Sequence, residues 1–365
     1  MAPFCYYLNM KTRWSETQIK EWYNKLPWLT GSNFLPSNVI NRFDMYQSYQ
    51  SEEHLKVAEV ELAKAYELGF NFVRLWTDFD CYYVDRNSYL SILDRYISIC
   101  DKYHQKVMIV LAHEEDLPYG DKFVPQKQTG PQKKLYTHFN RNYEEYNKHF
   151  SERKHYLEYQ ETKELYIQMV NDIVSKYRND NKIIAWNIIN EPGITIGDRS
   201  IGIIKDLFNI VRGLDPIQPL CVDIWRNIND DGTFQSEAET IGYQLSDFIS
   251  FHSYSPFPSF ERRIELLKNH YNRPIVVTEW LHRINHNNIE DIYPYLHDNK
   301  IGSCIWGFVN GDTFTDEPWD ILWEQYEKGN TEYDFTKWQH NILRRNLLPY
   351  DPKEIKLIKK INFKK

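Results

Sequence analysis

The sequence predicts an α/β fold, a single (β/α)8 TIM barrel over residues 1–365 with a long insertion after the third strand. Three observations support this prediction. Eight short apolar runs rich in β-branched residues alternate with segments of helical periodicity. Two of these runs end in a glutamate, and no repeat, low-complexity tract or linker divides the chain. We therefore expect one domain whose strands are buried on both faces, as in a parallel sheet covered by helices.

The first half of the chain contains four of the predicted strands and the helices between them. Ser15 and Gln18 form a capping box for a helix that ends near Lys25. Gly69 is placed to end the next helix, because a helix C-terminus favours glycine. Apolar stripes at helical spacing are Leu55, Ala58, Leu62, Ala65; Leu90, Leu93, Ile97, Cys100; and Leu165, Met169, Ile173, Tyr177. The strands are expected within residues 28–37, 72–76, 106–113 and 183–191.

The second half repeats the alternation. Strands are expected at residues 220–225, 247–254, 275–279 and 301–307. Apolar stripes predict helices over residues 201–211, 260–271 and 292–296, with only a short helix within 232–246. A helix near residues 338–346 and a last one, capped by Asp351 and Pro352, are expected to close the chain.

Residues 114–159 form the insertion. They are polar and rich in aromatic residues, and the early part shows no clear periodicity. A loop of this length inside a compact domain is usually functional. Because βα-loops surround the active site at the C-terminal face of such a barrel, we expect the insertion to border the cleft.

Composition narrows the classes of partner. The chain has 44 basic and 51 acidic residues, a net charge of −7, which argues against a nucleic-acid partner. No apolar run is long enough to span a membrane, so no membrane partner is expected. The 27 tyrosines, 19 phenylalanines and 11 tryptophans suit a sugar-binding cleft, although much of this aromatic content will be core.

The cysteines and the N-terminus bear on the compartment. The chain has five cysteines, an odd number, and no two of them have the spacing of metal ligands. We therefore expect reduced, buried thiols, as in a cytosolic protein. Residues 113–116 are interpreted as a polar loop and not as a metal site. Residues 1–10 lack the features of a signal peptide, which predicts a cytoplasmic protein, or a secreted one if a leader has been removed.

Two strand ends carry the candidate chemistry. The apolar run from Ile183 ends in Asn190, Glu191 and Pro192, where the proline stops the strand. Taken alone, this would more often be an ordinary acidic strand end. A second run of the same design ends at Glu279, however, and two strand-terminal carboxylates are what glycoside hydrolysis requires.

The residues around both glutamates resemble clan A glycoside hydrolases. Trp186–Pro192 and Val277–Trp280 are similar to the strand-four and strand-seven signatures of these retaining (β/α)8 enzymes, which include the cellulase-like family five. Residues 28–47 resemble a xylanase- or cellulase-like subset. The resemblance implies a retaining β-glycosidase that hydrolyses O-glycosidic bonds of oligo- or polysaccharides through a covalent glycosyl-enzyme, with no cofactor and no metal. A transglycosylase with the same site and a non-catalytic carbohydrate-binding barrel remain alternatives, and exo or endo action is left open.

The resemblance also implies roles for individual residues. Glu191 would be the acid/base and Glu279 the nucleophile. Asn190 would bind the sugar 2-hydroxyl, and Arg74 would support the nucleophile. His252 would line the cleft near Glu191, and the Tyr254 hydroxyl would donate a hydrogen bond to Glu279. Trp306 would form the floor of the −1 sugar site.

Other strand ends are weaker candidates. Asn33, His113, Trp225 and Trp280 are expected either to touch sugar or to pack behind the cleft. Residues 307–320, including Trp319, resemble a strand-eight loop of the xylanase-like subset. Asp312 stands where that resemblance would place a basic residue, so the identity of the sugar is left undetermined.

Overall fold

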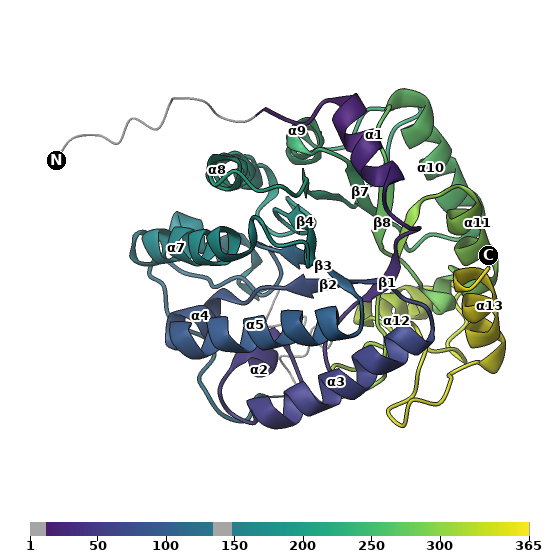
Figure 1. Cartoon of the computed structure of the whole chain (residues 1–365), viewed down its shortest axis with the longest axis horizontal. Coiled ribbons are helices and arrows are strands. Elements are labelled where there is room, and N and C mark those ends of the chain that lie inside the picture. The colour runs from purple at the N-terminus through teal and green to yellow at the C-terminus, as the bar shows by residue number, and fades with distance from the viewer. Residues whose placement is uncertain (1–11, 134–147, 365) are drawn as a thin grey trace.

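The computed structural model describes residues 12–133 and 148–364, and these form a parallel sheet nearly closed into a barrel and surrounded by helices (Figure 1). The strands are β1 (Thr30–Asn33), β2 (Phe72–Trp76), β3 (Lys106–Val110), β4 (Ile183–Asn187), β5 (Leu220–Cys221), β6 (Asp223–Ile224), β7 (Ile249–His252), β8 (Ile275–Glu279) and β9 (Gly302–Ile305). Their order in the sheet is β5-β4-β3-β2-β1-β9-β8-β7-β6.

The fifth strand of the barrel is divided into β5 and β6, which flank Val222. Leu220 and Cys221 pair with β4, whereas Asp223 and Ile224 pair with β7. The two halves thus join the two open ends of the sheet. The predicted (β/α)8 barrel is confirmed, with its fifth strand counted as two short ones.

The helices lie mainly outside the sheet (Figure 1). They are α1 (Glu16–Asn24), α2 (Arg42–Tyr46), α3 (Ser51–Glu67), α4 (Phe79–Val84), α5 (Arg86–Lys102), α7 (Gln160–Tyr177), α8 (Ser200–Gly213), α9 (Glu237–Leu245), α10 (Phe257–His270), α11 (Ile289–Asp298), α12 (Asp320–Glu327) and α13 (Pro352–Asn362). Short 3₁₀ turns occur at Phe150–Glu152, Tyr156–Glu158, Gly197–Arg199 and Arg283–Asn285. The capping box of Ser15 and Gln18 starts α1, and Asp351 caps α13, as predicted.

The interior of the barrel changes character along its axis. Near the N-terminal ends of the strands, Phe72 and Met108 belong to a small apolar cluster against which Trp22 of α1 packs. Two residues further along β2, the side chain of Arg74 occupies the same side of the strand, because side chains alternate with a period of two. Helix α1 therefore covers an apolar end, and the charged layer lies toward the C-terminal ends of the strands.

Two predicted elements differ from the structure. Residues 338–346 form no helix, because Asn341 has a positive φ of 57° and the Ile342 and Leu343 amides both donate to the Phe308 carbonyl. The helix in this part of the chain is α12, which lies earlier. Strand β4 ends at Asn187, so Glu191 lies in the loop that follows it instead of on the strand.

The described cysteines, Cys81, Cys100, Cys221 and Cys304, are free and buried, and Cys5 lies outside the described residues. Among the described residues, no helix has the length and apolar character needed to cross a membrane.

Candidate active site

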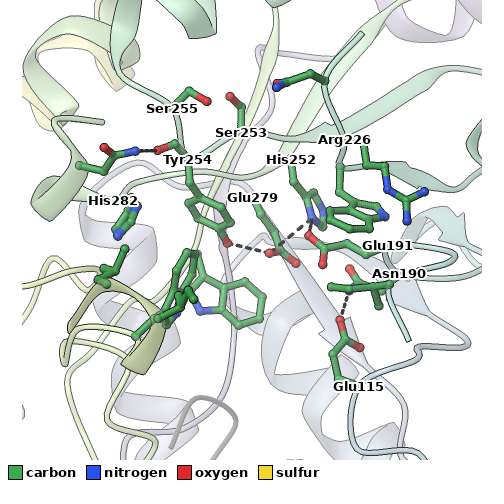
Figure 2. Close-up of a pocket in the computed structure, with 18 of the residues that line it drawn as sticks. Glu115, Asn190, Glu191, Arg226, His252, Ser253, Tyr254, Ser255, Glu279 and His282 are labelled. Atoms are coloured by element: carbon green, nitrogen blue, oxygen red, sulfur yellow. Dashed lines mark hydrogen bonds and ion pairs between the residues drawn. The ribbon is translucent and has the colours of Figure 1, made fainter. Parts of the chain in front are cut away.

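A cleft of about 670 Å³ opens where the strands end (Figure 2). Trp76, His252 and Glu279, the last residues of β2, β7 and β8, contribute to its lining. The volume lies in the usual range for small-ligand sites. Most of the other lining residues belong to the loops after β4, β6, β7, β8 and β9. This is the face of the barrel on which enzymes of this fold carry their active sites.

Glu191 and Glu279 approach each other in this cleft, with His252 beside both (Figure 2). The Nδ1 atom of His252 lies 2.6 Å from Oε1 of Glu191 and 3.5 Å from Oε2 of Glu279. One oxygen of each carboxylate and one ring nitrogen of His252 all lie within 4.8 Å of one another. This spacing matches the separation of about 5–5.5 Å that double displacement uses, and not the ~6.5–9.5 Å of inverting pairs.

Glu279 is held by hydrogen bonds to both of its oxygens. Arg74 Nη1 donates to Oε1 at 2.7 Å, and the Tyr254 hydroxyl donates to Oε2 at 2.7 Å. Burial raises the pKa of Glu279 to about 7, although the charges of His252 and Arg74 and the hydrogen bond from Tyr254 oppose this rise. Both hydrogen bonds orient the carboxylate and favour its ionised form.

Arg74 is completely buried and links several polar groups of the barrel interior. Besides Glu279, its guanidinium donates to Asp223 Oδ2 at 2.7 Å and to Asn33 Oδ1 at 2.7 Å. Burial by itself would raise the pKa of Asp223, but the charges of Arg74 and His252 and the hydrogen bonds from His252 and Ser250 together outweigh it and hold that pKa well below its usual range. Two carboxylates thus compensate the buried guanidinium charge.

His252 is a cation at neutral pH. Burial by itself lowers the pKa of His252, but the carboxylates of Glu279 and Asp223 outweigh this effect and raise the pKa to about 10. The imidazolium therefore lies as a positive charge between the two glutamates of the cleft, where it favours the ionised form of Glu279.

A metal ion is the alternative occupant of this cluster. Among the described residues, Glu191, His252 and Glu279 form the one group whose ligand atoms lie close enough to hold a metal. A metal-bound histidine must be neutral at the coordinating nitrogen, whereas His252 keeps its proton up to a pKa of about 10. The buried Arg74 also supplies a positive charge to Glu279. Metal binding at this nitrogen would therefore require His252 to lose its proton.

Asn190 lies beside Glu191 and has a partner on each side of its amide (Figure 2). Its Oδ1 accepts from Arg74 Nη2 at 2.6 Å, and its Nδ2 donates to Glu115 Oε1 at 2.6 Å. The amide is thereby oriented between a cation and an anion. It lines the cleft, as expected of a residue that binds a sugar hydroxyl.

Aromatic side chains contribute much of the remaining surface. Trp306, directly after β9, lines the cleft in a T-shaped contact with Trp76 at 5.8 Å between ring centroids. Trp225 lines the cleft and its Nε1 donates to the Pro192 carbonyl at 3.2 Å, and Trp319 contacts the Tyr254 ring edge-on at 5.2 Å between ring centroids. Sequence reasoning missed Trp76 as a residue of the cleft. Its position was a usable signal, because residues two apart on a strand point to the same side and Arg74 was expected to face the site.

Four predicted substrate-binding residues lie outside the cleft lining. Arg74 supports Glu279 but is wholly buried. Asn33 is directed into the barrel, where its Nδ2 donates to the Thr278 carbonyl at 2.8 Å. Trp280 follows Glu279 and faces the core, and its Nε1 donates to Ser303 Oγ at 3.1 Å. The fourth, His113, packs beside the Trp76 ring at 5.9 Å. Arg74 thus contacts Glu279, as the resemblance implies, and the contacts of Asn33, His113 and Trp280 agree with the alternative that these three residues pack behind the cleft.

Residues 114–159, predicted to border the cleft, are only partly covered by the described chain. Within the described parts of this insertion, Glu115 alone lines the cleft, and residues 134–147 lie outside the described chain. The segment after β9 supplies a wall of the cleft, with lining residues Trp319, Ile321, Leu322, Gln325 and Tyr333. Asp312 lies outside the lining and pairs with Arg345 at 2.7 Å. Of the wall residues, only Trp319 was singled out by the sequence.

The barrel and its pair of closely spaced glutamates define a retaining glycoside hydrolase. Residues 51–312, more than half of the chain, match the family model described as Cellulase (glycosyl hydrolase family 5). The chain therefore belongs to glycosyl hydrolase family 5, and its substrate is a carbohydrate.

Solved structures share the fold at low sequence identity. The hyperthermostable endo-1,4-β-D-mannanase from Thermotoga petrophila is 16% identical with a TM-score of 0.55, covering 90% of this chain and 99% of that one. A GH5_18 variant from Streptomyces cattleya in complex with Manβ1-4GlcNAc is 10% identical with a TM-score of 0.55, covering 92% and 81%. A family 5 mannosidase from Rhizomucor miehei in complex with mannosyl-fructose is 14% identical with a TM-score of 0.54, covering 92% of each chain. A comparison with curated protein sequences returned no significant match.

Proposed function

We propose that the protein hydrolyses β-mannosidic bonds, with Glu279 as nucleophile and Glu191 as acid/base. The observation that carries the mechanism is the short spacing of the two carboxylates, within 4.8 Å in one cleft. The roles differ because their partners differ. Glu279 accepts from Arg74 and Tyr254, which orient it and favour its ionised form, whereas Glu191 contacts a histidine cation at the side of the cleft.

In the first step Glu279 attacks the anomeric carbon while the carboxylic acid of Glu191 gives its proton to the departing glycosidic oxygen. The C–O bond to the leaving group breaks as the bond to Glu279 forms, which yields a glycosyl-enzyme and a free alcohol. Glu191 becomes anionic in this step. The imidazolium of His252, 2.6 Å away, stabilises the charge that develops there.

In the second step Glu191 takes a proton from water, and the water oxygen attacks the anomeric carbon. The bond to Glu279 breaks, the sugar is released with its original β-configuration, and Glu191 is again protonated. A sugar hydroxyl in place of water would give transglycosylation. Analysis of products with excess acceptor sugar distinguishes the two outcomes.

The choice of mannose is supported by the solved structures with the same fold. Those from Thermotoga petrophila and Rhizomucor miehei are described as a mannanase and a mannosidase, and the Streptomyces cattleya complex contains a β-linked mannose. Asn190 lines the cleft and would bind the sugar 2-hydroxyl, and mannose differs from glucose in the orientation of that hydroxyl.

We expect mannotetraose to be cleaved with a kcat/KM roughly ten- to hundredfold above that of cellotetraose, the range over which one substrate contact discriminates. Chromatography of the products from both tetrasaccharides measures this, and the order in which products appear separates exo from endo action. The aryl β-mannoside and β-glucoside serve as a matched pair of C2 epimers. Faster cleavage of the glucose-based substrates would contradict the proposed sugar and leave the mechanism intact.

The pH dependence of activity follows from Glu279. Burial raises its pKa to about 7, so its carboxylate becomes protonated and loses nucleophilicity as the pH falls through that value. We expect kcat/KM to decline on the acid side with a limb near pH 7. Tyr254→Phe removes a hydrogen bond that lowers the pKa, so the limb should move to higher pH in this variant. A profile from pH 4 to 9 measures both, and a limb that moves to lower pH in Tyr254→Phe would refute this account.

A further inference from the structure

The carboxylate of Glu114 lies buried beneath the loop that carries Glu191. Its Oε1 accepts from the Gly193 amide at 2.9 Å, and its Oε2 accepts from the Thr195 and Ile196 amides at 3.0 and 3.1 Å. The hydroxyl of Ser200, the first residue of α8, donates to the same carboxylate. Charge-assisted hydrogen bonds in a buried environment are strong, so these four donors make Glu114 a rigid attachment point for the loop.

The loop needs such an attachment because its backbone is strained at Glu191. This residue has a φ of 40°, in the left-handed region, which is strained for a residue with a side chain. Gly193, two residues on, has a φ of 81°. A conformation of this kind persists only where surrounding contacts enforce it. Glu114 supplies these contacts from Gly193 onward, and the Asn190 amide, which donates to the Ala112 carbonyl at 2.9 Å, supplies one on the other side.

Glu115, the residue after Glu114, orients Asn190, the residue before Glu191. Glu115 Oε1 accepts from Asn190 Nδ2 at 2.6 Å, while Arg74 donates to Asn190 Oδ1. An inverted amide would place its NH₂ group against a guanidinium and its oxygen against a carboxylate. Glu115 and Arg74 therefore fix the orientation in which Asn190 faces the cleft.

We propose that Glu114 and Glu115 are positioning residues that together hold the Asn190–Glu191 pair in its catalytic geometry. Glu114 sets the backbone that aims Glu191 at the leaving-group oxygen, and Glu115 sets the amide that meets the sugar. This inference rests on the proposed role of Glu191 as acid/base. It assigns a task to two buried carboxylates that the two chemical steps do not use directly.

The hydrogen-bond patterns predict different tolerance at the two positions. Glu114→Gln places an NH₂ group among three amide N–H donors and a hydroxyl, so at least one donor loses its acceptor and the loop shifts. Glu115→Gln keeps an oxygen for Asn190 Nδ2 and should be mild, whereas Glu115→Leu removes that acceptor. We expect large losses in Glu114→Gln and Glu115→Leu, with activity largely retained in Glu115→Gln.

The decisive measurement is the dependence of kcat/KM on the leaving group. An oligosaccharide needs proton donation by Glu191, whereas a 2,4-dinitrophenyl glycoside scarcely does. Glu114→Gln should therefore lose roughly 10²-fold or more on the oligosaccharide and only a few-fold on the activated glycoside, within the range of general acid catalysis. The double variant with Glu191→Ala should be no worse than Glu191→Ala alone, because effects on one functional unit do not add. Equal losses on both substrates would overturn the proposal.

A crystal structure of Glu114→Gln tests the same inference without any activity. We expect residue 191 to leave its positive φ and its side chain to move away from His252. An unchanged loop in that structure would overturn the positioning role, whereas a wild-type enzyme inactive on every β-glycoside would overturn only the proposed function.

If Glu114→Gln fails to fold, Ser200→Ala removes one of the four donors and leaves the three amides. It should show a smaller loss, about tenfold, confined to substrates with poor leaving groups. If Ser200→Ala loses no activity, or loses it equally on both substrates, the positioning role of Glu114 is overturned.

Discussion

Replacing Glu279 with alanine is expected to abolish turnover of every glycoside substrate, activated or not. The variant has no carboxylate to attack the anomeric carbon, so the glycosyl-enzyme does not form. Removal of a covalent nucleophile in other hydrolases lowers kcat by on the order of 10⁶-fold, and a loss of similar size is expected here. Turnover of an aryl glycoside and of an oligosaccharide by Glu279→Ala measures the effect.

The matched control for this variant is Glu161→Ala, which removes an exposed glutamate on the outer helix α7. It should retain wild-type activity. Azide added to Glu279→Ala can occupy the space of the missing carboxylate and attack the sugar directly, which gives an α-glycosyl azide. Residual hydrolysis near the wild-type rate, or a β-glycosyl azide, would show that Glu279 is not the nucleophile.

Replacing Glu191 with alanine should have a selective effect. Cleavage of an oligosaccharide should fall by roughly 10²–10⁴-fold, the usual contribution of general acid catalysis. An activated aryl glycoside needs little proton donation, so its glycosyl-enzyme should still form. Hydrolysis of that intermediate should become slow, because the base that activates water is missing. A rapid burst of the aryl alcohol followed by slow turnover is the expected time course.

Azide identifies the second step in this variant. As an anion it needs no general base, so it should restore turnover of Glu191→Ala and give a β-glycosyl azide. Rate measurements with increasing azide, together with the product anomer from nuclear magnetic resonance, provide the test. An α-glycosyl azide from Glu191→Ala would reverse the assignment of the two glutamates.

The fold was largely predictable because its signals are local. The strands are short β-branched runs, and the capping residues Ser15 and Asp351 mark helix starts by hydrogen bonds within one turn. The prediction was wrong at residues 338–346, where a helix was expected. There the chain is held by hydrogen bonds to Phe308, more than thirty residues earlier in sequence, and short-range periodicity does not report such contacts.

The candidate site was predictable to the extent that it depends on strand ends. In a parallel barrel all strands end on one face, so Glu279 and the His252–Tyr254 pair were expected to meet Glu191. Their hydrogen bonds agree with that expectation. The wall formed by residues 319–333 was harder to predict from the sequence. This segment follows the last strand, and only the course of the folded chain brings it to the cleft.

The sequence by itself determined the barrel, the family and the two glutamates, because strand patterns and the motifs at strand ends are properties of neighbouring residues. Only the tertiary structure decided which side chains reach the cleft. Trp280 directly follows β8 and Asn33 ends β1, so both lie at strand ends, as Glu279 and Trp76 do. Trp280 is nevertheless packed in the core, and Asn33 is hydrogen-bonded inside the barrel. The positioning contacts of Glu114 likewise join residues about eighty positions apart. Such contacts arise from the closure of the barrel, which brings the loops of different strands together.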